Sequence, residues 1–404
     1  MLTLSLAEQE FIRAHLADDV RALSLRTPPQ GLDLRKLVAQ IAARQKAREK
    51  LPAWYANDAL IFPPALSVEQ ASSEQTARYK AALVNGKRLL DLTGGMGVDS
   101  LAFAQQMEQV IYIERNDELA QLAAHNLPLL GAINISVQTG DGLAFLATYP
   151  HTLEETDWIY LDPHRRDATG GKVVQLQDCE PDMSQPSMQA FLLAKAKRIL
   201  LKASPLLDLN STVQQFMGRV ESIHVVAVSG EVKEILFTIS NQPVAQDNML
   251  VNAVNLLTNE TKTLSFRWHE ERTTNVTLGN PRTYLYEPNA AVLKAGAFRL
   301  VAARYGLTKI AQNSHLYTSD EVCWDFPGRI FSLIDILKAD AKSVKARIPD
   351  LKANLTVRNF PQTVAELRKK LSLREGGDKY IMATTLLNGD KRLLITQKVS
   401  RIQP

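Results

Sequence analysis

The chain has 404 residues, of which 45% are hydrophobic and 22% charged, with a net charge of +4. This is the composition of a globular protein with room for two to four domains, and no apolar run reaches the ~18–20 residues that span a bilayer. Two cysteines exclude a disulfide framework and a cysteine zinc site, and the first residues do not read as a signal peptide, so we expect a cytoplasmic protein without a bound metal.

The charge is concentrated at the end of the chain. Residues 331–404 contain fifteen Lys and Arg against seven Asp and Glu, a net of +8, which leaves −4 for the rest. A basic segment of this kind suggests a polyanionic partner, and an ordinary solvated surface is the alternative.

The N-terminal region, residues 1–68, is predicted to be helical. Ser5 and Glu8 have the spacing of a capping box, and Asp33 precedes an amphipathic helix over 34–51. We expect this region to serve for packing. The proline-punctuated stretch over 52–70 is predicted to be extended, and a helix is expected over 72–84.

From Lys87 onward, strands alternate with helices. Strands are predicted over 88–92, 109–114, 134–141, 157–163 and 198–204, and helices over 98–106, 117–131, 188–197 and 209–217. Residues 222–240 read as two strands joined at Gly230. This pattern predicts an α/β fold, a doubly wound Rossmann-like sheet with an antiparallel finish.

Residues beyond 241 mix strands and helices as in an α+β fold. Strands are predicted over 261–268, 275–279, 283–288, 328–335, 354–359, 380–387 and 392–399, and helices over 289–306, capped by Asn289, and 363–373.

The stretch LLDLTGGMGVDSLAFA, Leu89–Ala104, joins a predicted strand to a predicted helix through Gly94, Gly95 and Gly97. Glycine lets backbone N–H groups approach a ligand closely, and the start of a helix favours an anionic group. The spacing differs from that of nicotinamide-binding and Walker loops. A tight turn without any ligand is the alternative.

Acidic residues follow three successive strands. Asp91 precedes the glycines, Glu114 lies 23 residues later, and Asp141 ends the third strand. Ligands of such sheets bind at the carboxyl ends of the strands, which would place Glu114 on ribose hydroxyls and Asp141 near an adenine amino group.

Together the motifs DLTGGMG, IERN, GDG and LDP resemble those of class I S-adenosylmethionine-dependent methyltransferases, over about Gln70 to Ser240. The resemblance implies a seven-stranded sheet whose last strand is antiparallel, with Asp91 and the glycines at the methionine end of the cofactor. The cofactor-binding residues that it implies are Asp91, Thr93, Gly94, Gly95, Gly97, Glu114, Arg115, Asp141, Gly142 and Asp162.

The whole chain resembles a narrower bacterial family with ferredoxin-like and THUMP-like C-terminal domains. The stretches EPNAAVLKAGAF, DFPGR and RNFPQTVAELRKKLSLREGGDKYIMATT carry this resemblance. It implies a methyltransferase domain over 69–241, a ferredoxin-like domain over 242–328 and a THUMP-like domain over 329–404. THUMP domains deliver RNA to modifying enzymes, so the resemblance implies RNA as partner.

The fourth strand ends in YLDPHRRD, where Asp162, Pro163, His164 and Arg165 are the candidate catalytic residues. Methyltransferases acting on exocyclic amines carry Asp, Asn or Ser, then two prolines and an aromatic residue. This chain keeps the first two positions and departs at His164 and Arg165. Arg165 would stack on a base or hold a phosphate, or form an ion pair within 165–167.

Methylation at a pyrimidine carbon needs a cysteine nucleophile, and the nearby Cys179 reads as incidental. Methylation at nitrogen is therefore favoured, with Asp162 or else His164 orienting the acceptor and taking its proton. Gln70 and Ser73 would touch the methionine carboxylate or only cap a helix. Lys202 would face a substrate phosphate or simply be solvated.

The leading hypothesis is an RNA methyltransferase acting on a base nitrogen of tRNA or rRNA. The alternatives are a methyltransferase for a small molecule or protein, and a non-catalytic RNA-binding protein that keeps the cofactor fold.

Overall fold

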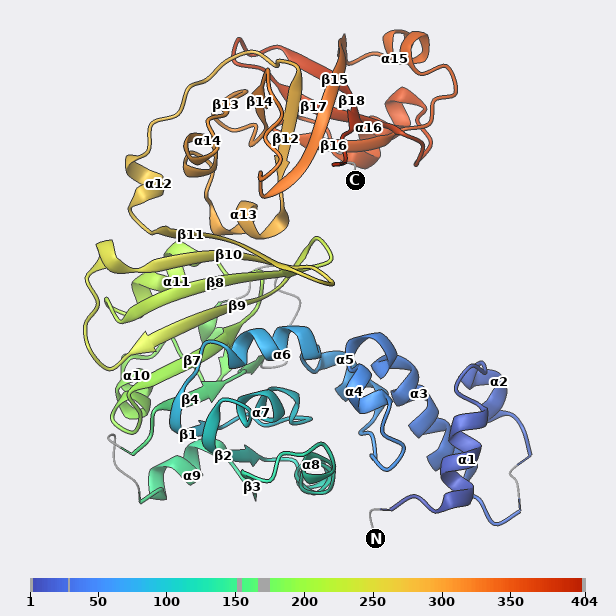
Figure 1. The fold of residues 1–404 in the computed structure, drawn as a ribbon, viewed down its shortest axis with the longest axis vertical. Helices are drawn as coiled ribbons and strands as arrows, with labels where there is room; N and C mark the ends of the chain where they lie inside the picture. The colour runs from blue at the N-terminus through green and yellow to red at the C-terminus, as the bar shows by residue number, and fades with distance from the viewer. Residues whose placement is uncertain (1–2, 28–29, 151–154, 166–174, 402–404) are drawn as a thin grey trace. The chain divides into compact units, whose positions relative to one another are not determined.

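The structure is a computed structural model that describes residues 3–27, 30–150, 155–165 and 175–401 (Figure 1). The chain forms two compact units, one made of residues up to 221 with 236–244, and the other of 222–235 with the residues from 245 onward. Within the described residues, none of the helices combines the length and the apolar character needed to cross a membrane.

The first unit begins with helices. Their bounds are α1 (Leu6–Ala14), α2 (Val20–Ser24), α3 (Leu34–Lys50), α4 (Pro52–Tyr55) and α5 (Ala65–Gln70). The capping box of Ser5 and Glu8 is confirmed, as is the cap that Asp33 provides for α3. The expectation of an extended chain over 52–70 is wrong at both ends, because a proline begins α4 and another precedes α5.

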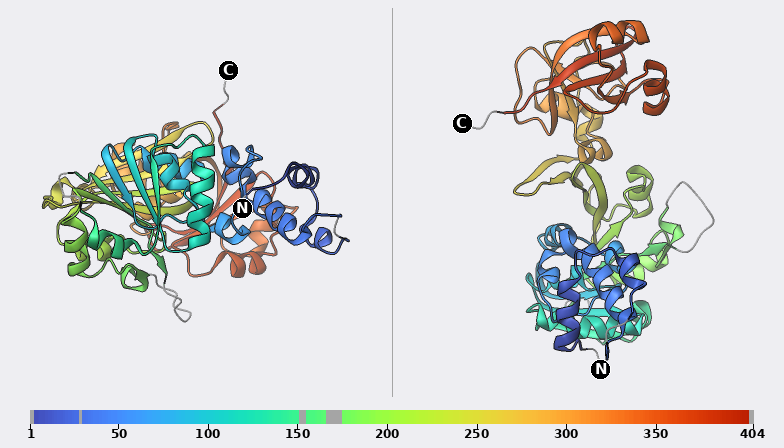
Figure 2. Two further views of the ribbon diagram at one scale, coloured as in Figure 1. Left: turned by 90° about the horizontal axis from the view of Figure 1, so that it is seen from below. Right: turned by 90° about the vertical axis from the view of Figure 1, so that its right-hand side faces the viewer.

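These helices pack on α8 (Asp117–Leu129), which in the left view of Figure 2 stands between the sheet and the N-terminal helices. Leu37 and Ile41 of α3 share an apolar cluster with Leu122 of α8. The buried amide of Asn126 accepts from Ile61 N at 3.0 Å and donates to Ile61 O at 2.8 Å. This arrangement agrees with the packing role expected of the N-terminal region.

The main sheet has the strand order β11-β10-β8-β9-β7-β4-β1-β2-β3. Its strands are β1 (Gly86–Asp91), β2 (Met107–Glu114), β3 (Ile135–Thr139), β4 (Trp158–Leu161), β7 (Arg198–Ala203), β8 (Val220–Val228), β9 (Glu231–Ser240), β10 (Leu250–Leu256) and β11 (Thr261–Arg267). The connecting helices are α6 (Glu74–Ala81), α7 (Val98–Phe103), α8, α9 (Gly142–Thr148), α10 (Pro186–Leu193) and α11 (Leu209–Gln215). The predicted α/β fold is confirmed.

Strands β3, β2, β1, β4 and β7 are parallel neighbours, so their carboxyl ends meet at one edge. Strands β8 and β9 are joined by Ser229 and Gly230 alone, so they run antiparallel as the resemblance implies. The sheet exceeds the expected seven strands, because β10 adds to β8 in parallel and β11 follows it.

The second unit contains a mixed sheet in the order β13-β14-β12-β15-β18-β17-β16. Its strands are β12 (Tyr284–Pro288), β13 (Thr308–Lys309), β14 (Tyr317–Ser319), β15 (Gly328–Lys338), β16 (Asn354–Arg358), β17 (Lys379–Thr385) and β18 (Lys391–Lys398). The helices are α12 (Glu270–Thr273), α13 (Ala290–Ala295), α14 (Leu300–Arg304), α15 (Ala341–Arg347) and α16 (Val364–Leu371).

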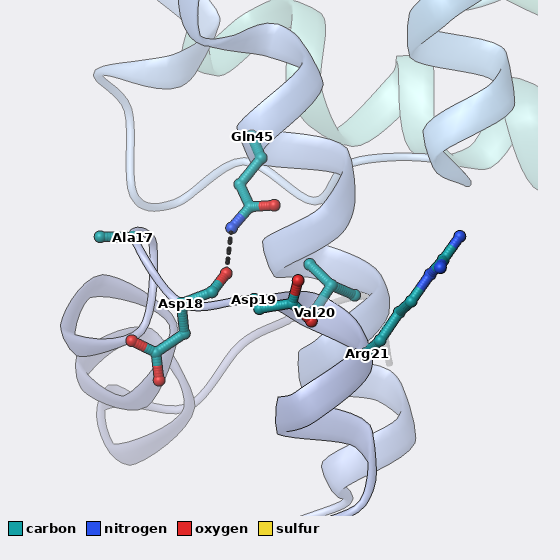
Figure 3. Close-up of a pocket in the computed structure, with 6 residues that line it drawn as sticks. All are labelled: Ala17, Asp18, Asp19, Val20, Arg21 and Gln45. Atoms are coloured by element: carbon teal, nitrogen blue, oxygen red, sulfur yellow. Dashed lines mark hydrogen bonds between the residues drawn. The ribbon is translucent and has the colours of Figure 1, made fainter.

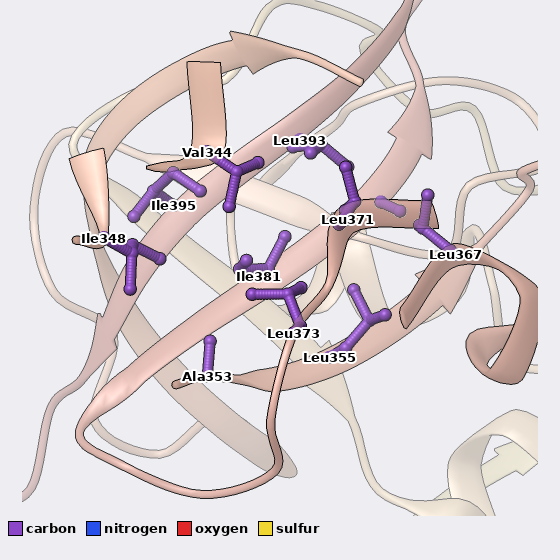
Figure 4. Packing of buried hydrophobic residues seen from close by; sticks show 11 residues of the cluster. Val344, Ile348, Ala353, Leu355, Leu367, Leu371, Leu373, Ile381, Leu393 and Ile395 are labelled. Atoms are coloured by element: carbon purple, nitrogen blue, oxygen red, sulfur yellow. The ribbon is translucent and has the colours of Figure 1, made fainter. Parts of the chain in front are cut away.

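Both faces of this second sheet are covered. On one face Ile381 and Leu393 join Val344 of α15 and Leu367 of α16 in the cluster of Figure 4. The next residue along β17, Met382, points to the other face and packs with a second cluster. Successive side chains of a strand alternate between the faces, which explains why these strands read as continuous apolar runs.

Two expectations for the second unit were wrong, and one helix was missed. The helix predicted over 289–306 is broken, because Gly296 takes a left-handed φ of 76° and ends α13. No strand forms over 275–279, where Leu278 makes an isolated bridge. Helix α15 was not predicted. Val344 is the buried residue of this helix, and a single buried residue gives no apolar repeat by which a helix could be found.

Candidate active site

The predicted acidic residues lie along the edge where the parallel strands end. Asp91 ends β1, Glu114 ends β2, Asp141 follows β3 and Asp162 follows β4. Because β1 pairs with both β2 and β4, and β2 with β3, these positions are neighbours across the sheet. The acidic residues that the sequence predicted to lie together are therefore neighbours in the fold.

Asp91 is buried, with 1% of its surface exposed. Its carboxylate accepts hydrogen bonds from the Ser100 hydroxyl at 2.6 Å and from the Thr93 N–H at 3.0 Å, which orders the turn that follows β1. Burial raises the pKa of Asp91 to about 7, and the nearby carboxylates Asp99 and Asp162 add to the rise. Its contact with the cofactor stays a prediction.

The glycine turn is shaped by packing as much as by any ligand. A Cβ on Gly94 would lie 2.2 Å from the ring of Tyr112, whose hydroxyl donates to Gly95 O at 2.5 Å. Gly97 has a φ of 87° and caps α7. Gly95 has a φ of 56°, and a Cβ there would meet nothing closer than 3.8 Å. Of the three, Gly95 is the position with open space beside the backbone.

Glu114 and Asp141 also hold backbone groups. Glu114 accepts from Gly95 N and from Asn116 N, each at 2.7 Å, and so ties the glycine turn to the end of β2. Asp141 is exposed and caps α9 by accepting from Ala144 N at 2.8 Å. Gly142, the first residue of α9, is required by packing, since its Cβ would lie 2.4 Å from Leu92 O.

Thr93 connects the turn after β1 to the end of β4. Its hydroxyl accepts from the Asp162 N–H at 2.8 Å. The Asp162 carboxylate, with 40% of the side chain exposed, pairs with Lys202 Nζ at 2.6 Å. Lys202 lies at the end of β7 and is 15% exposed, so the expectation of a solvated lysine is wrong: the neighbouring strand end supplies its counter-charge.

A buried ion pair behind the glycine turn was missed by the sequence reasoning. Lys80 of α6 is fully buried and lies 3.2 Å from Asp99 of α7. Asp99 also accepts from the hydroxyls of Ser72 at 2.8 Å and Tyr160 at 2.7 Å. Burial opposes the charge on Asp99, but Lys80, Lys202 and these hydroxyls outweigh it and lower its pKa.

His164 and Arg115, which were predicted for different roles, are in contact near the carboxyl ends of the parallel strands. Arg115 Nη2 lies 2.8 Å from His164 Nε2, and because arginine only donates, this imidazole nitrogen accepts. Glu180 lies 3.9 Å from the same nitrogen. His164 and Arg165 form β5 (His164–Arg165), which pairs with β6 (Cys179–Glu180). Pro163 lies between β4 and β5.

The remaining residues that were considered for the site lie as follows. Cys179 is buried, and its thiol lies 3.8 Å from Gln175 O. Ser73 caps α6 by accepting from Thr76 N at 3.1 Å, which confirms the helix-cap interpretation, and Gln70 is exposed at the end of α5. Arg166 and Asp167, considered for an ion pair with Arg165, lie outside the described residues.

Three protein families match parts of the chain. Residues 65–150 match the family described as protein-L-isoaspartate(D-aspartate) O-methyltransferase, residues 284–327 a ferredoxin-like domain, and residues 328–398 a THUMP domain-like family. A protein of Porphyromonas gingivalis W83, provisionally described as a methyltransferase, has a crystal structure with 36% sequence identity and a TM-score of 0.86, and the match covers 98% of each chain.

The chain belongs to the S-adenosylmethionine-dependent methyltransferases with ferredoxin-like and THUMP-like C-terminal domains. An uncharacterised S-adenosylmethionine-dependent methyltransferase of Mycobacterium tuberculosis strain H37Rv is 21% identical over 311 residues, covering 76% of this chain and 80% of that protein. The protein-L-isoaspartate O-methyltransferase of Koribacter versatilis is 34% identical over 96 residues, 24% of this chain and 43% of that protein.

The candidate site of this methyltransferase fits the cofactor S-adenosylmethionine. Glu114 accepts two backbone N–H groups, but a carboxylate offers about four lone-pair sites, so ribose hydroxyls can still donate to it. Asp141 is exposed at the next strand end, and Gly95 leaves open space at the turn. These three residues would hold the ribose, the adenine and the methionine end.

A surface hollow of about 570 Å³ lies elsewhere in the methyltransferase, between α2 and α3 (Figure 3). It is lined by Ala17, Asp18, Asp19, Val20, Arg21 and Gln45. The amide of Gln45 donates to Asp18 O at 2.8 Å across it. None of the predicted site residues lines this hollow.

Proposed function

We propose that this methyltransferase methylates a base nitrogen in structured RNA, a tRNA or an rRNA. The observation that carries the proposal is the environment of Asp162. Its carboxylate is 40% exposed at the strand edge that holds the predicted cofactor residues. Two contacts fix the position of Asp162. Its carboxylate pairs with Lys202 at 2.6 Å, and its backbone N–H donates to the hydroxyl of Thr93.

A carboxylate in this position suits a nitrogen acceptor. S-adenosylmethionine supplies a methyl group that its sulfonium makes electrophilic. Asp162 accepts a hydrogen bond from the N–H of the base, which aligns the nitrogen lone pair with the methyl group. After transfer the nitrogen carries an extra proton, which Asp162 takes up. His164 is the weaker candidate, because Arg115 donates to its Nε2.

Support for RNA comes from the C-terminal region. Residues 328–398 match the THUMP domain-like family, and residues 331–404 carry a net charge of +8. Three of these basic residues, Arg368, Lys369 and Lys370, lie in the last turn of α16. Phosphate contacts from such residues supply most of the affinity for nucleic acid.

The match to protein-L-isoaspartate methyltransferases does not favour a protein substrate. It spans residues 65–150, which contain β1 to β3, and ends before Asp162. The shared part is therefore the half of the sheet predicted to hold the cofactor. The residues proposed to meet the acceptor lie outside the match.

The test is mass spectrometry of nucleosides from tRNA and rRNA of a deletion strain, followed by complementation. We expect one methylated nucleoside to disappear and to return with the intact gene. Asp162→Asn should slow transfer to unmodified RNA at least ~100-fold, because a positioned acid or base contributes that much. Asp117→Asn, an exposed acid on α8, is the matched control. An unchanged nucleoside profile would overturn the RNA proposal.

A further inference from the structure

The second unit contains a buried carboxylate held between two arginines. Glu287 of β12 is 2% exposed, and Arg329 of β15, its partner across the strands, donates to Glu287 Oε2 from Nε at 2.9 Å. Arg358, the last residue of β16, places Nη2 2.9 Å from Glu287 Oε1. The three residues belong to the stretches EPNA, DFPGR and RNFP.

This cluster joins distant parts of the sheet. Strands β15, β18 and β17 lie between β12 and β16 in the strand order, yet Arg358 reaches Glu287. The sheet therefore curls until the end of β16 approaches β12. An ion pair that ties these strands needs one arginine for one carboxylate. The second guanidinium leaves the cluster with a surplus positive charge.

The two arginines keep donors available to an external group. Their side chains are 45% and 34% exposed, although Glu287 between them is buried. A guanidinium carries five N–H donors, of which Arg329 uses Nε and Nη2 on Glu287. Arg358 donates from Nη1 to Val357 O at 3.3 Å and places Nη2 beside Glu287, which leaves one further N–H on each of these two nitrogens. Glu287 therefore holds both groups in place without saturating them.

Aromatic rings lie beside the same cluster. The guanidinium of Arg329 lies 5.4 Å from the ring centre of Phe331 and 5.9 Å from that of Tyr380. Phe331 is fully buried, whereas Tyr380 is half-buried. Proteins that bind single-stranded nucleic acid combine arginines with accessible aromatic rings. The cation contacts a phosphate, and a base stacks on the ring.

We propose that Arg329 and Arg358, held by Glu287, bind a phosphate group of the RNA strand, with Tyr380 offering a face to the adjoining base. The RNA part rests on the proposed function, whereas the phosphate site does not. Inorganic phosphate has the same chemistry and is the second source to be separated. Two arginines in fixed positions match the oxygens of a phosphate better than mobile lysines do.

The experiment uses the full chain and a fluorescein-labelled, unmodified tRNA transcript, with anisotropy measured over a range of salt concentrations. Arg329→Gln and Arg358→Gln should each weaken binding about tenfold or more, and each should reduce the slope of log K against log salt by about 0.7–0.9. Arg282→Gln is the matched control, because Arg282 is 47% exposed and pairs with Asp320. It should change affinity less than twofold.

A second measurement needs no variant and therefore does not depend on their folding. Phenylglyoxal modification of the unsubstituted chain, read by peptide mass spectrometry, should show Arg329 and Arg358 protected by the tRNA and Arg282 unprotected. Affinities equal to that of Arg282→Gln, or no protection, would overturn the site while leaving methylation of RNA intact. Protection by inorganic phosphate alone, without tRNA binding, would support the phosphate site and overturn its assignment to tRNA.

Discussion

Replacement of Lys80 by methionine tests the ion pair behind the glycine turn. The substitution keeps the length of the side chain but removes the cation that lies 3.2 Å from the buried Asp99, so that Lys202 is the remaining lysine that favours its charge. Loss of one partner of a buried pair costs about 3–5 kcal/mol. Ser72 and Tyr160 continue to donate to Asp99, so we expect the lower end, about 3 kcal/mol at pH 7.

The loss of stability in Lys80→Met should depend on pH. In the intact protein the pKa of Asp99 is lowered, so its stabilisation is present at neutral pH and is lost as the pH falls through that low pKa. Without Lys80, burial is opposed less strongly, so the pKa of Asp99 rises relative to the intact protein and part of that stabilisation is missing at neutral pH. The deficit should therefore be largest at neutral pH and shrink toward pH ~4.

The assay is urea unfolding followed by hydrogen exchange of peptides from β1 and α7, which reports on the first unit alone. Lys80→Met combined with Asp99→Asn should recover most of the loss, because neither charge remains. Lys87→Met, an exposed lysine on β1, should change stability by less than ~0.5 kcal/mol. A loss of unfolding free energy below ~1 kcal/mol in Lys80→Met, or an equal loss at neutral pH and at pH ~4, would refute the reasoning.

Three further predictions concern packing, charge and pH. Gly94→Ala should destabilise the protein by about 3 kcal/mol in thermal unfolding, since its Cβ would strike Tyr112, whereas Gly95→Ala should cost only ~1–2 kcal/mol; equal losses would contradict the packing argument. Glu287→Gln should cost about 1–2 kcal/mol in urea, because two arginines lose their counter-charge but remain partly exposed to water, and an unchanged midpoint would disprove this. Burial lowers the pKa of His224 from 6.5 to about 4, so its contribution to stability falls as the pH drops through this window; His224→Gln should remove about 3 kcal/mol of that dependence, visible as a flatter profile of stability against pH.

The order of elements in the first unit was predictable because the chemistry is local. Strands such as β4, Trp158–Leu161, are buried on both faces and read as apolar runs, and the acid at each strand end marks where the run stops. The parallel order then brings Asp91, Glu114 and Asp162 to one edge. The left-handed break at Gly296 was missed, because a single glycine within an otherwise helical pattern does not by itself show whether the helix continues.

The interior of the candidate site was not predictable from single residues. Lys80 reads as a surface lysine and Asp99 as an ordinary acid in the first turn of a helix, and nothing local shows that α6 and α7 bury them together. The reason for Gly94 was likewise hidden, because Tyr112 lies on the next strand. The meeting of Arg115 with His164 depends on the fold after β4.

The hydroxyl of Thr93 links the turn after β1 to the residue that follows β4. It belongs to the turn that would lie along the methionine end, yet it accepts the N–H of the residue proposed to align the base. If one ligand shifts this oxygen, we expect the peptide beneath the other ligand to shift with it. S-adenosylmethionine and the acceptor base should therefore change each other's affinity by the same factor. Thr93→Val should abolish this coupling.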